Sequence, residues 1–334
     1  MGRLVLLLLL LLVSIPVAQA QDAPLEIVTT TTQVTDLTTV LVGDLLGEQI
    51  VITALMGAGV DPHLYQPTES DVAAMSRADA VFYSGLFLEG RFGEVFNALG
   101  ERSVLTYAVS QPVKDAGFTF GGFTLSEEFS DVDDPHFWFD PRNWQLAATG
   151  LAEQLALLDP ANAETFADNA AAYVKQLDLL YAWGVEAMSV VPEEQRVLIT
   201  SHDAFQYFGD AFGWEVRGLQ GISTESEAGV ADIEALADFI IERSIPVMFI
   251  ESSVPPDAIE AVQEAVEAAG GSVGIGAREL YSDAMGAPDE FGGIYIGMIA
   301  TNIVTVVQGF GYEVAAFPME LGALPEELTG SASS

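Results

Sequence analysis

The sequence predicts an α/β protein of two βα lobes, each with about four parallel strands, joined by a long helix. Short β-rich runs alternate with helical periods before and after residues 160–190, and that central stretch is itself helical throughout. A chain of 334 residues, 50% of them hydrophobic, is long enough for two domains. The expected divisions are an N-terminal βα lobe over residues 21–158, a connecting helix over 159–191, a C-terminal βα lobe over 192–314 and a tail over 315–334.

The N-terminal lobe is predicted from short apolar runs separated by helical stretches. Such runs are typical of strands that helices cover on both faces. Residues 114–134 have no period and include Gly117, Gly121 and Gly122, so a loop is expected there. The expected strands are residues 25–30, 49–56, 80–84 and 104–109, and the expected helices are residues 33–46, 68–77, 92–99 and 143–158.

The connecting helix is predicted by its first residues and its apolar face. Pro160 follows Asp159, as in helices that begin with an N-cap and a proline at the first position. Apolar side chains, among them Phe166, Tyr173 and Leu177, then recur at spacings of three and four. About thirty helical residues span roughly 45 Å, which is more than one lobe requires. A helix of that length is suited to join two lobes.

The C-terminal lobe is predicted because the βα alternation returns after Pro192. The tail from Ala315, rich in Pro, Glu, Gly and Ser, is expected to be poorly ordered at its end. The expected strands are residues 196–200, 214–219, 247–250 and 272–275, and the expected helices are residues 204–212, 230–243, 257–269 and 294–310.

The first twenty residues have the pattern of a secretory signal peptide. Arg3 precedes an apolar run over residues 4–13, and Ala18-Gln19-Ala20 provides an A-x-A cleavage site. The run is shorter than the roughly 20 residues that a membrane-spanning helix needs. We expect cleavage after Ala20 and a periplasmic or otherwise exported protein. Because the chain contains no cysteine, it is not expected to be a lipoprotein.

The composition narrows the possible partners. The chain has 49 acidic residues against 11 Lys and Arg, a formal charge of −38, so nucleic acid and anionic membranes are not expected to bind. The acidity indicates either a field that concentrates cations or a solvated surface suited to a saline habitat, and its even spread favours the second. With no cysteine, any metal must be held by histidine, carboxylate or backbone oxygen.

The three histidines of the chain occur in similar contexts. His63 and His136 each follow an Asp-Pro pair, and His202 lies between Ser201 and Asp203. Each is expected just outside a strand or before a helix, where ligands bind in open α/β sheets. One such histidine would more often be a surface or capping residue, but three in matched positions favour a metal site. A neighbouring carboxylate is suited to orient each ring.

Three neutral imidazoles need at least one anionic partner to bind a divalent cation. Glu251 follows a predicted strand, and Asp283 lies in the loop after the last one, so both are candidates. Spacing alone does not choose between them. Each is equally well explained as a solvated loop acid or a helix cap.

Five stretches carry a resemblance to a known family: 56–65 (MGAGVDPHLY), 134–140 (DPHFWFD), 201–208 (SHDAFQYF), 249–253 (FIESS) and 280–286 (LYSDAMG). In this order they resemble the cluster A-I solute-binding proteins of zinc and manganese ABC transporters, the TroA-like periplasmic metal-binding family. The resemblance covers nearly the whole chain after residue 20. It implies two (β/α)4 lobes joined by a long rigid helix, with a metal site in the cleft between them. The ligands it implies are His63, His136, His202 and Asp283.

The resemblance leaves the choice of metal open. The loop before His136 has no histidine, whereas dedicated zinc importers often carry a His-rich loop there. His202 stands where manganese-selective members typically place a glutamate. Three imidazoles and a carboxylate suit Zn²⁺, and a bidentate Asp283 would also admit Mn²⁺. We expect a monomer that carries one Zn²⁺ or Mn²⁺ per chain to the membrane permease of an ABC importer, and no enzyme.

A secreted zinc-dependent hydrolase is the alternative function. It would need an open coordination position and a general base near a bound water. The sequence contains no H-E-x-x-H motif, and four protein ligands would close the site, which favours transport over catalysis. A two-lobe sugar or amino-acid binding protein ranks lower, because the arginines that often line such clefts are scarce here.

Overall fold

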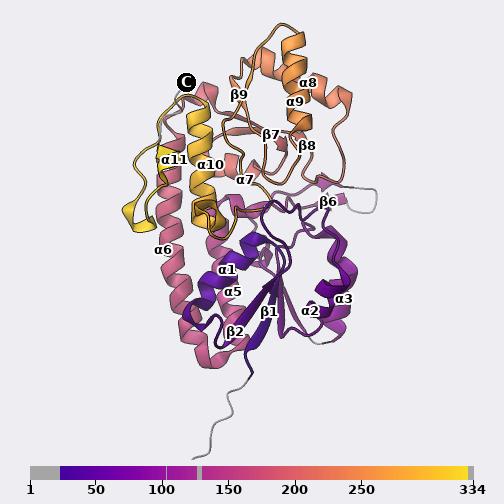
Figure 1. Ribbon diagram of the computed structural model, residues 1–334, viewed down its shortest axis with the longest axis vertical. Coiled ribbons are helices and arrows are strands. Elements are labelled where there is room, and N and C mark those ends of the chain that lie inside the picture. Colours follow the sequence, from indigo (N-terminus) through magenta and orange to yellow (C-terminus); the bar gives the residue numbers. More distant parts are fainter. Residues whose placement is uncertain (1–22, 103, 126–129, 330–334) are drawn as a thin grey trace, which may run out of the picture.

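The computed structural model describes residues 23–102, 104–125 and 130–329, so the predicted signal peptide lies outside the described residues. Figure 1 shows two α/β lobes, one above the other, with the long helix α6 running beside both. The expected fold class, two βα lobes joined by a long helix, is confirmed. Among the described residues, no helix combines the length and the apolar character that crossing a membrane requires.

The N-terminal lobe contains a parallel sheet in the order β2-β1-β3-β4. Parallel strands need crossover connections, and helices supply them here. The four strands predicted from the apolar runs are confirmed, each to within two residues at either end: β1 (Leu25–Thr29), β2 (Ile50–Ala54), β3 (Ala80–Tyr83) and β4 (Leu105–Ala108). The helices of this lobe are α1 (Thr32–Val42), α2 (Glu69–Met75), α3 (Gly93–Glu101), α4 (Gln111–Asp115) and α5 (Pro141–Leu158).

Helix α1 is shorter than the sequence pattern predicts, because a glycine ends it. The Thr31 side chain caps its first turn by accepting a hydrogen bond from the Val34 N–H. Gly43 then adopts a φ of +54°, which takes the chain out of the α-helix and into a short 3-10 turn over Gly43–Leu45.

Helix α6 (Ala163–Met188) is the long connecting element. The expected helix over residues 160–190 is interrupted near its start, where Pro160–Asn162 form a 3-10 turn capped by the Asp159 carboxylate. One face of α6 is buried against α5, α1 and α10, so it contacts helices of both lobes. At 26 residues it spans roughly 39 Å, which is long enough to run beside both sheets.

The C-terminal lobe contains two parallel strand pairs that lie side by side and are joined by a backbone hydrogen bond. β7 pairs with β8, β9 pairs with β10, and the Phe249 N–H donates to the Ile199 carbonyl at 2.9 Å between the pairs. The strands are β7 (Val197–His202), β8 (Glu215–Gln220), β9 (Val247–Met248) and β10 (Gly274–Ile275). The helices are α7 (Gln206–Phe212), α8 (Val230–Arg243), α9 (Asp257–Ala268) and α10 (Tyr295–Gly309).

Two segments have more structure than the sequence pattern predicts. The expected loop over residues 114–134 contains a small antiparallel pair, β5 (Phe123–Thr124) and β6 (Ser130–Val132), whose strands are too short to show a period. The described part of the tail continues to a short helix, α11 (Glu326–Thr329), in which Leu328 is buried, and the end that was expected to be poorly ordered, residues 330–334, lies outside the described residues.

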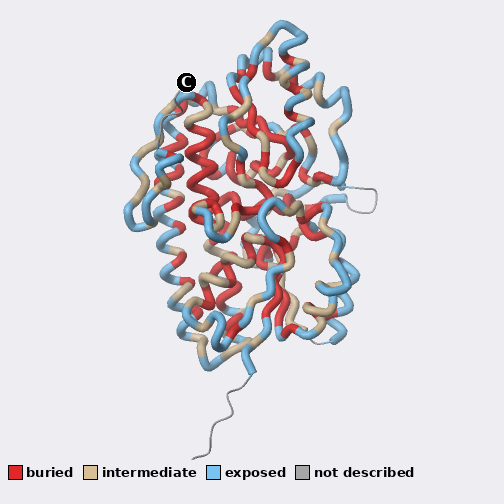
Figure 2. The backbone as a smooth tube through the Cα atoms, viewed as in Figure 1, coloured by how far each residue is buried: buried red, intermediate tan, exposed pale blue. Residues whose placement is uncertain are grey.

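The hydrophobic core is continuous across the junction of the lobes. Figure 2 shows buried segments along the inner faces of the long helices and at the junction. Every residue from Tyr295 to Val307 in α10 is buried, because α6, α1, α11 and the turn Phe291–Gly293 all pack against this helix. The cluster that α10 contributes to also includes Trp138 and Trp144 of the N-terminal lobe, so the two lobes share one core.

Candidate metal centre

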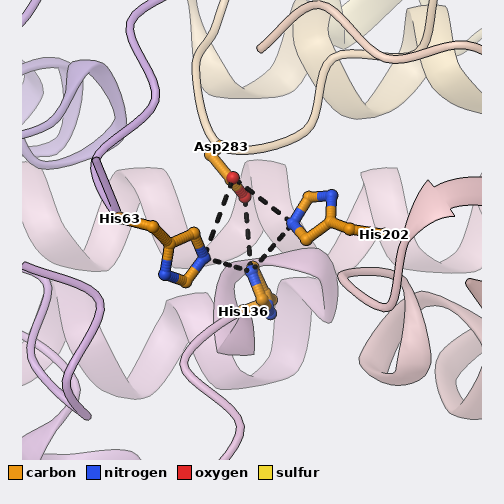
Figure 3. A group of neighbouring side chains, drawn as sticks. All are labelled: His63, His136, His202 and Asp283. Carbon is orange, nitrogen blue, oxygen red and sulfur yellow. Dashed lines mark hydrogen bonds and ion pairs between the residues drawn. The ribbon is translucent and has the colours of Figure 1, made fainter. Parts of the chain in front are cut away.

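The four side chains implied as ligands meet at the junction of the two lobes (Figure 3). His63 lies in the loop after β2, and His136 lies just before the 3-10 turn Phe137–Phe139 that leads into α5. The sequence analysis expected His202 just outside a strand, but β7 continues two residues further than predicted and His202 is its last residue. Asp283 lies in the loop between β10 and α10.

Four of the distances between ligand atoms match the edges of a tetrahedral metal site, and His63 Nε2 lies further from Asp283 Oδ2, at 3.9 Å. His136 Nε2 lies 3.3 Å from His63 Nε2, 3.4 Å from His202 Nε2 and 3.3 Å from Asp283 Oδ1. A tetrahedral site with metal–ligand bonds of about 2.0–2.1 Å has edges of roughly 3.3–3.4 Å. Asp283 Oδ2 also lies 3.3 Å from His202 Nε2, so both carboxylate oxygens face the centre. The arrangement accommodates one metal ion, with Asp283 binding through one or two oxygens.

The backbone of every histidine at the site is held by a carboxylate. In each case the main-chain N–H donates to one carboxylate oxygen. In each Asp-Pro-His segment the carboxylate belongs to the aspartate two residues before the histidine. For the third histidine the carboxylate comes from the end of a neighbouring strand. The three pairs are His63 with Asp61 at 2.8 Å, His136 with Asp134 at 2.9 Å and His202 with Glu251 at 2.8 Å.

Two of the three rings are also oriented by the same carboxylates. His136 Nδ1 lies 2.7 Å from Asp134 Oδ1, and His202 Nδ1 lies 2.6 Å from Glu251 Oε2. A carboxylate at Nδ1 keeps the proton on that nitrogen and leaves the Nε2 lone pair for a metal. Glu251, which the sequence left as a candidate anion at the centre, therefore lies behind His202, outside the four converging residues.

The carboxylates also set the charge of the rings in the metal-free protein. Burial alone would lower the pKa of His136, but Asp134 and Asp283 outweigh it and raise the pKa to about 9. Burial opposes the charge on His202 in the same way, yet Glu251 and Asp283 raise its pKa well above the usual value. Both rings are therefore protonated at neutral pH. A divalent metal that replaces these two protons leaves the net charge of the buried site unchanged.

Asp283 and His63 complete the electrostatics of the site. Burial alone would raise the pKa of Asp283, but the facing charges of His202 and His136 hold it well below its usual value. Neither oxygen of Asp283 has a hydrogen-bond donor in suitable geometry among the described residues. Burial lowers the pKa of His63 to about 3, so this ring is neutral and ready to coordinate. The buried, ionised carboxylate of Asp283 is therefore suited to bind a cation.

Gly218, which the sequence analysis did not single out, positions the histidine of the second lobe. A Cβ at Gly218 would lie 2.4 Å from Asp203 N and 2.5 Å from the His202 carbonyl carbon, so β8 approaches β7 closely at the site. A glycine inside a strand is the signal that marks such an approach.

Gly218→Ala is expected to destabilise the protein by about 1–3 kcal/mol, because the added methyl forces the end of β7 to move. The displaced His202 should also weaken metal binding. Thermal unfolding and metal titration measure the two effects. Gly221→Ala is the matched control, because its Cβ meets nothing within 4 Å. Equal behaviour of both variants would contradict the role assigned to Gly218.

Glu251→Gln is expected to lower the affinity for Zn²⁺ by roughly 10–100-fold, as loss of an outer partner of a metal-bound histidine does. The amide keeps an oxygen that can accept the His202 main-chain N–H, but it lacks the charge that faces His202 Nδ1 at 2.6 Å. Competition with a chelating indicator measures the affinity, and the exposed Glu242→Gln on α8 is the control. An affinity equal to that of the parent protein would show that Glu251 does not support His202.

The comparisons with known proteins agree with this fold. The sequence profile described as "Zinc-uptake complex component A periplasmic" matches residues 27–309. The chain is 42% identical over 291 residues to the zinc-binding protein TroA of Treponema pallidum, covering 87% of this chain and 90% of that protein. It is 37% identical over 291 residues to the manganese-binding lipoprotein MntA of Bacillus subtilis, covering 87% and 91% of the two chains.

The fold is shared with a solved structure of the same group. The solved structure of the periplasmic zinc-binding protein TroA from Treponema pallidum matches with a TM-score of 0.77 at 41% identity, covering 85% of this chain and 98% of that one. Fold and site define a solute-binding protein of the metal-transporting ABC class, not an enzyme, so the hydrolase alternative is not supported. The chain belongs to the family of periplasmic zinc-uptake components.

Proposed function

We propose that this protein binds one Zn²⁺ or Mn²⁺ per chain through His63, His136, His202 and Asp283 and delivers it to the membrane permease of an ABC importer. The observation that carries the proposal is the convergence of these four buried side chains, all with ligand atoms within 4.8 Å of one another. Four protein ligands close the coordination sphere of the ion, which suits transport of a cargo.

The site accommodates either metal, but with unequal affinity. Three imidazoles and one carboxylate oxygen match the ligands that Zn²⁺ prefers, and the second oxygen of Asp283 offers the higher coordination number that suits Mn²⁺. By the Irving–Williams order Zn²⁺ binds more tightly in direct competition. The names of the two relatives, one zinc-binding and one manganese-binding, support both metals as cargo.

The protein is proposed to act as an exported monomer that is not anchored by an acylated cysteine. The relative from Bacillus subtilis is named a lipoprotein, whereas this chain contains no cysteine to acylate. Its charge of −38 disfavours nucleic acid as a partner. Cleavage after Ala20 is proposed from the A-x-A pattern.

Calorimetric titration of the chelator-stripped protein tests the proposal. We expect one Zn²⁺ per chain, displacement of bound Mn²⁺ by Zn²⁺, and no displacement of Zn²⁺ by equimolar Mn²⁺. The exposed Glu267→Gln on α9 serves as a control for non-specific binding to the acidic surface. Several weak sites of similar affinity would indicate surface binding and would overturn the proposal.

A further inference from the structure

His63 differs from the other two histidines of the centre in how its ring is held. Among the described residues, no carboxylate lies at hydrogen-bonding distance from its Nδ1, whereas His136 and His202 each have one. Its Nε2 lies 3.9 Å from Asp283, against 3.3 Å for the other two rings. Its side chain is 4% exposed where the other ligand side chains are 0% exposed. His63 is therefore the least constrained of the four.

The Asp61 carboxylate holds His63 through the backbone and also reaches across the cleft. Asp61 Oδ1 accepts the His63 main-chain N–H at 2.8 Å, as Asp134 does for His136. Its second oxygen, Oδ2, accepts the hydroxyl of Thr224 at 2.6 Å. Thr224 is buried and lies in residues 221–229, the connection between β8 and α8 of the C-terminal lobe. One carboxylate therefore joins a ligand of the first lobe to a loop of the second.

Other contacts place this loop against the first lobe at the same point. Arg91 of the N-terminal lobe forms an ion pair with Glu225, with Nη2 and Nε at 3.1 and 3.2 Å from Oε1. Both side chains are well exposed, so this pair stabilises the contact only weakly in water. Gly59 also lies near the second lobe, since a Cβ there would be 3.6 Å from the Ser252 carbonyl oxygen. The partly buried Thr224–Asp61 bond, which has a charged acceptor, is thus the stronger of the polar contacts here.

We propose that Thr224 is a positioning residue for metal retention: its hydroxyl fixes the Asp61 carboxylate that holds His63, so opening of residues 221–229 frees His63 first. The inference rests on the proposed function, because it assumes that His63 binds the metal. Closing of this loop completes the site, and its opening leaves three ligands on the ion. A metal held by three ligands dissociates faster than one held by four.

Stopped-flow capture of Zn²⁺ by a chelator tests the proposal on the full-length protein. Thr224→Val has nearly the same shape but no hydroxyl, and it should release Zn²⁺ about tenfold faster, as loss of a hydrogen bond to a charged group predicts. Thr224→Ser keeps the hydroxyl and should release Zn²⁺ within about twofold of the parent rate. Arg91→Gln removes only the exposed ion pair and should behave like the parent protein.

Two further readouts separate positioning from a general loss of stability. The metal-free Thr224→Val protein should melt only a few degrees below the parent, as loss of one hydrogen bond predicts, and amide hydrogen exchange should increase specifically in residues 57–65 of its Zn²⁺-bound form. If Thr224→Val does not fold, Thr224→Ala takes its place with the same expectations. A parent-like release rate in a variant lacking the hydroxyl overturns the role of Thr224. Absence of stoichiometric Zn²⁺ binding by the parent protein overturns the proposed function instead.

Discussion

Replacing His63 with alanine is expected to lower the affinity for Zn²⁺ by more than about 100-fold, since loss of an outer partner alone costs roughly 10–100-fold. The metal-free variant should remain folded. The ring of His63 is neutral at the pH of the experiment, because burial lowers its pKa to about 3, so its removal leaves no buried charge without a partner. Competition titration and thermal unfolding measure the two properties.

His202→Ala is the informative comparison, because it should lose both affinity and stability. The ring of His202 lies 2.6 Å from Glu251, and removing it leaves that buried carboxylate without its charge partner. Breaking a buried ion pair in this way destabilises proteins by about 3–5 kcal/mol. We therefore expect the metal-free His63→Ala protein to keep the stability of the parent and the metal-free His202→Ala protein to lose part of it. If the His63→Ala variant bound Zn²⁺ as tightly as the parent protein, His63 would not be a metal ligand.

Zinc affinity is expected to fall steeply as the pH decreases below about 9. The pKa of His136 in the metal-free protein is raised to about 9, and that of His202 is raised well above its usual value. Below these values each ring carries a proton that the metal must displace. The affinity should then fall by roughly tenfold per pH unit for each displaced proton. Calorimetry between pH 6 and pH 9 in buffers of different ionisation enthalpy should show release of about two protons per Zn²⁺.

The stability of the metal-free protein should change with pH in the opposite direction. A histidine with a raised folded-state pKa contributes stability that is fully present below the unfolded value of about 6.5 and is lost as the pH rises through the folded value. For His136 this window lies between 6.5 and about 9. For the preceding prediction, a Zn²⁺ affinity that does not change between pH 6.5 and pH 9 would contradict the pairing of the histidines with carboxylates. If the histidines instead kept the pKa of free histidine, the change in Zn²⁺ affinity would occur near pH 6.5.

The sequence predicts the fold and the histidines of the site for a simple physical reason. Parallel strands bring their carboxyl ends to one edge of a sheet, so histidines that follow strands in two facing lobes come together. The βα alternation and the long apolar face of the connecting helix are local patterns that packing did not override. The break at Pro160 and the end of α1 at Gly43 depend on single residues within those patterns.

The rest of the site depends on contacts that are distant in sequence. Glu251 and Asp283 lie on neighbouring segments, and only the side-chain directions show that Asp283 faces the centre while Glu251 supports His202. The two Asp-Pro-His segments are identical in sequence, yet Asp134 orients a ring and Asp61 binds Thr224. That partner lies 163 positions further along the chain, and no local pattern could identify it.

Anomalous diffraction from crystals of the Zn²⁺-loaded protein, recorded on both sides of the zinc absorption edge, tests the central claim most directly. The account predicts one strong peak per chain at the junction of the lobes. The peak should lie about 2.0–2.2 Å from Nε2 of His63, His136 and His202 and from at least one oxygen of Asp283. A peak bound elsewhere on the acidic surface, or one coordinated by Glu251 in place of Asp283, would contradict it.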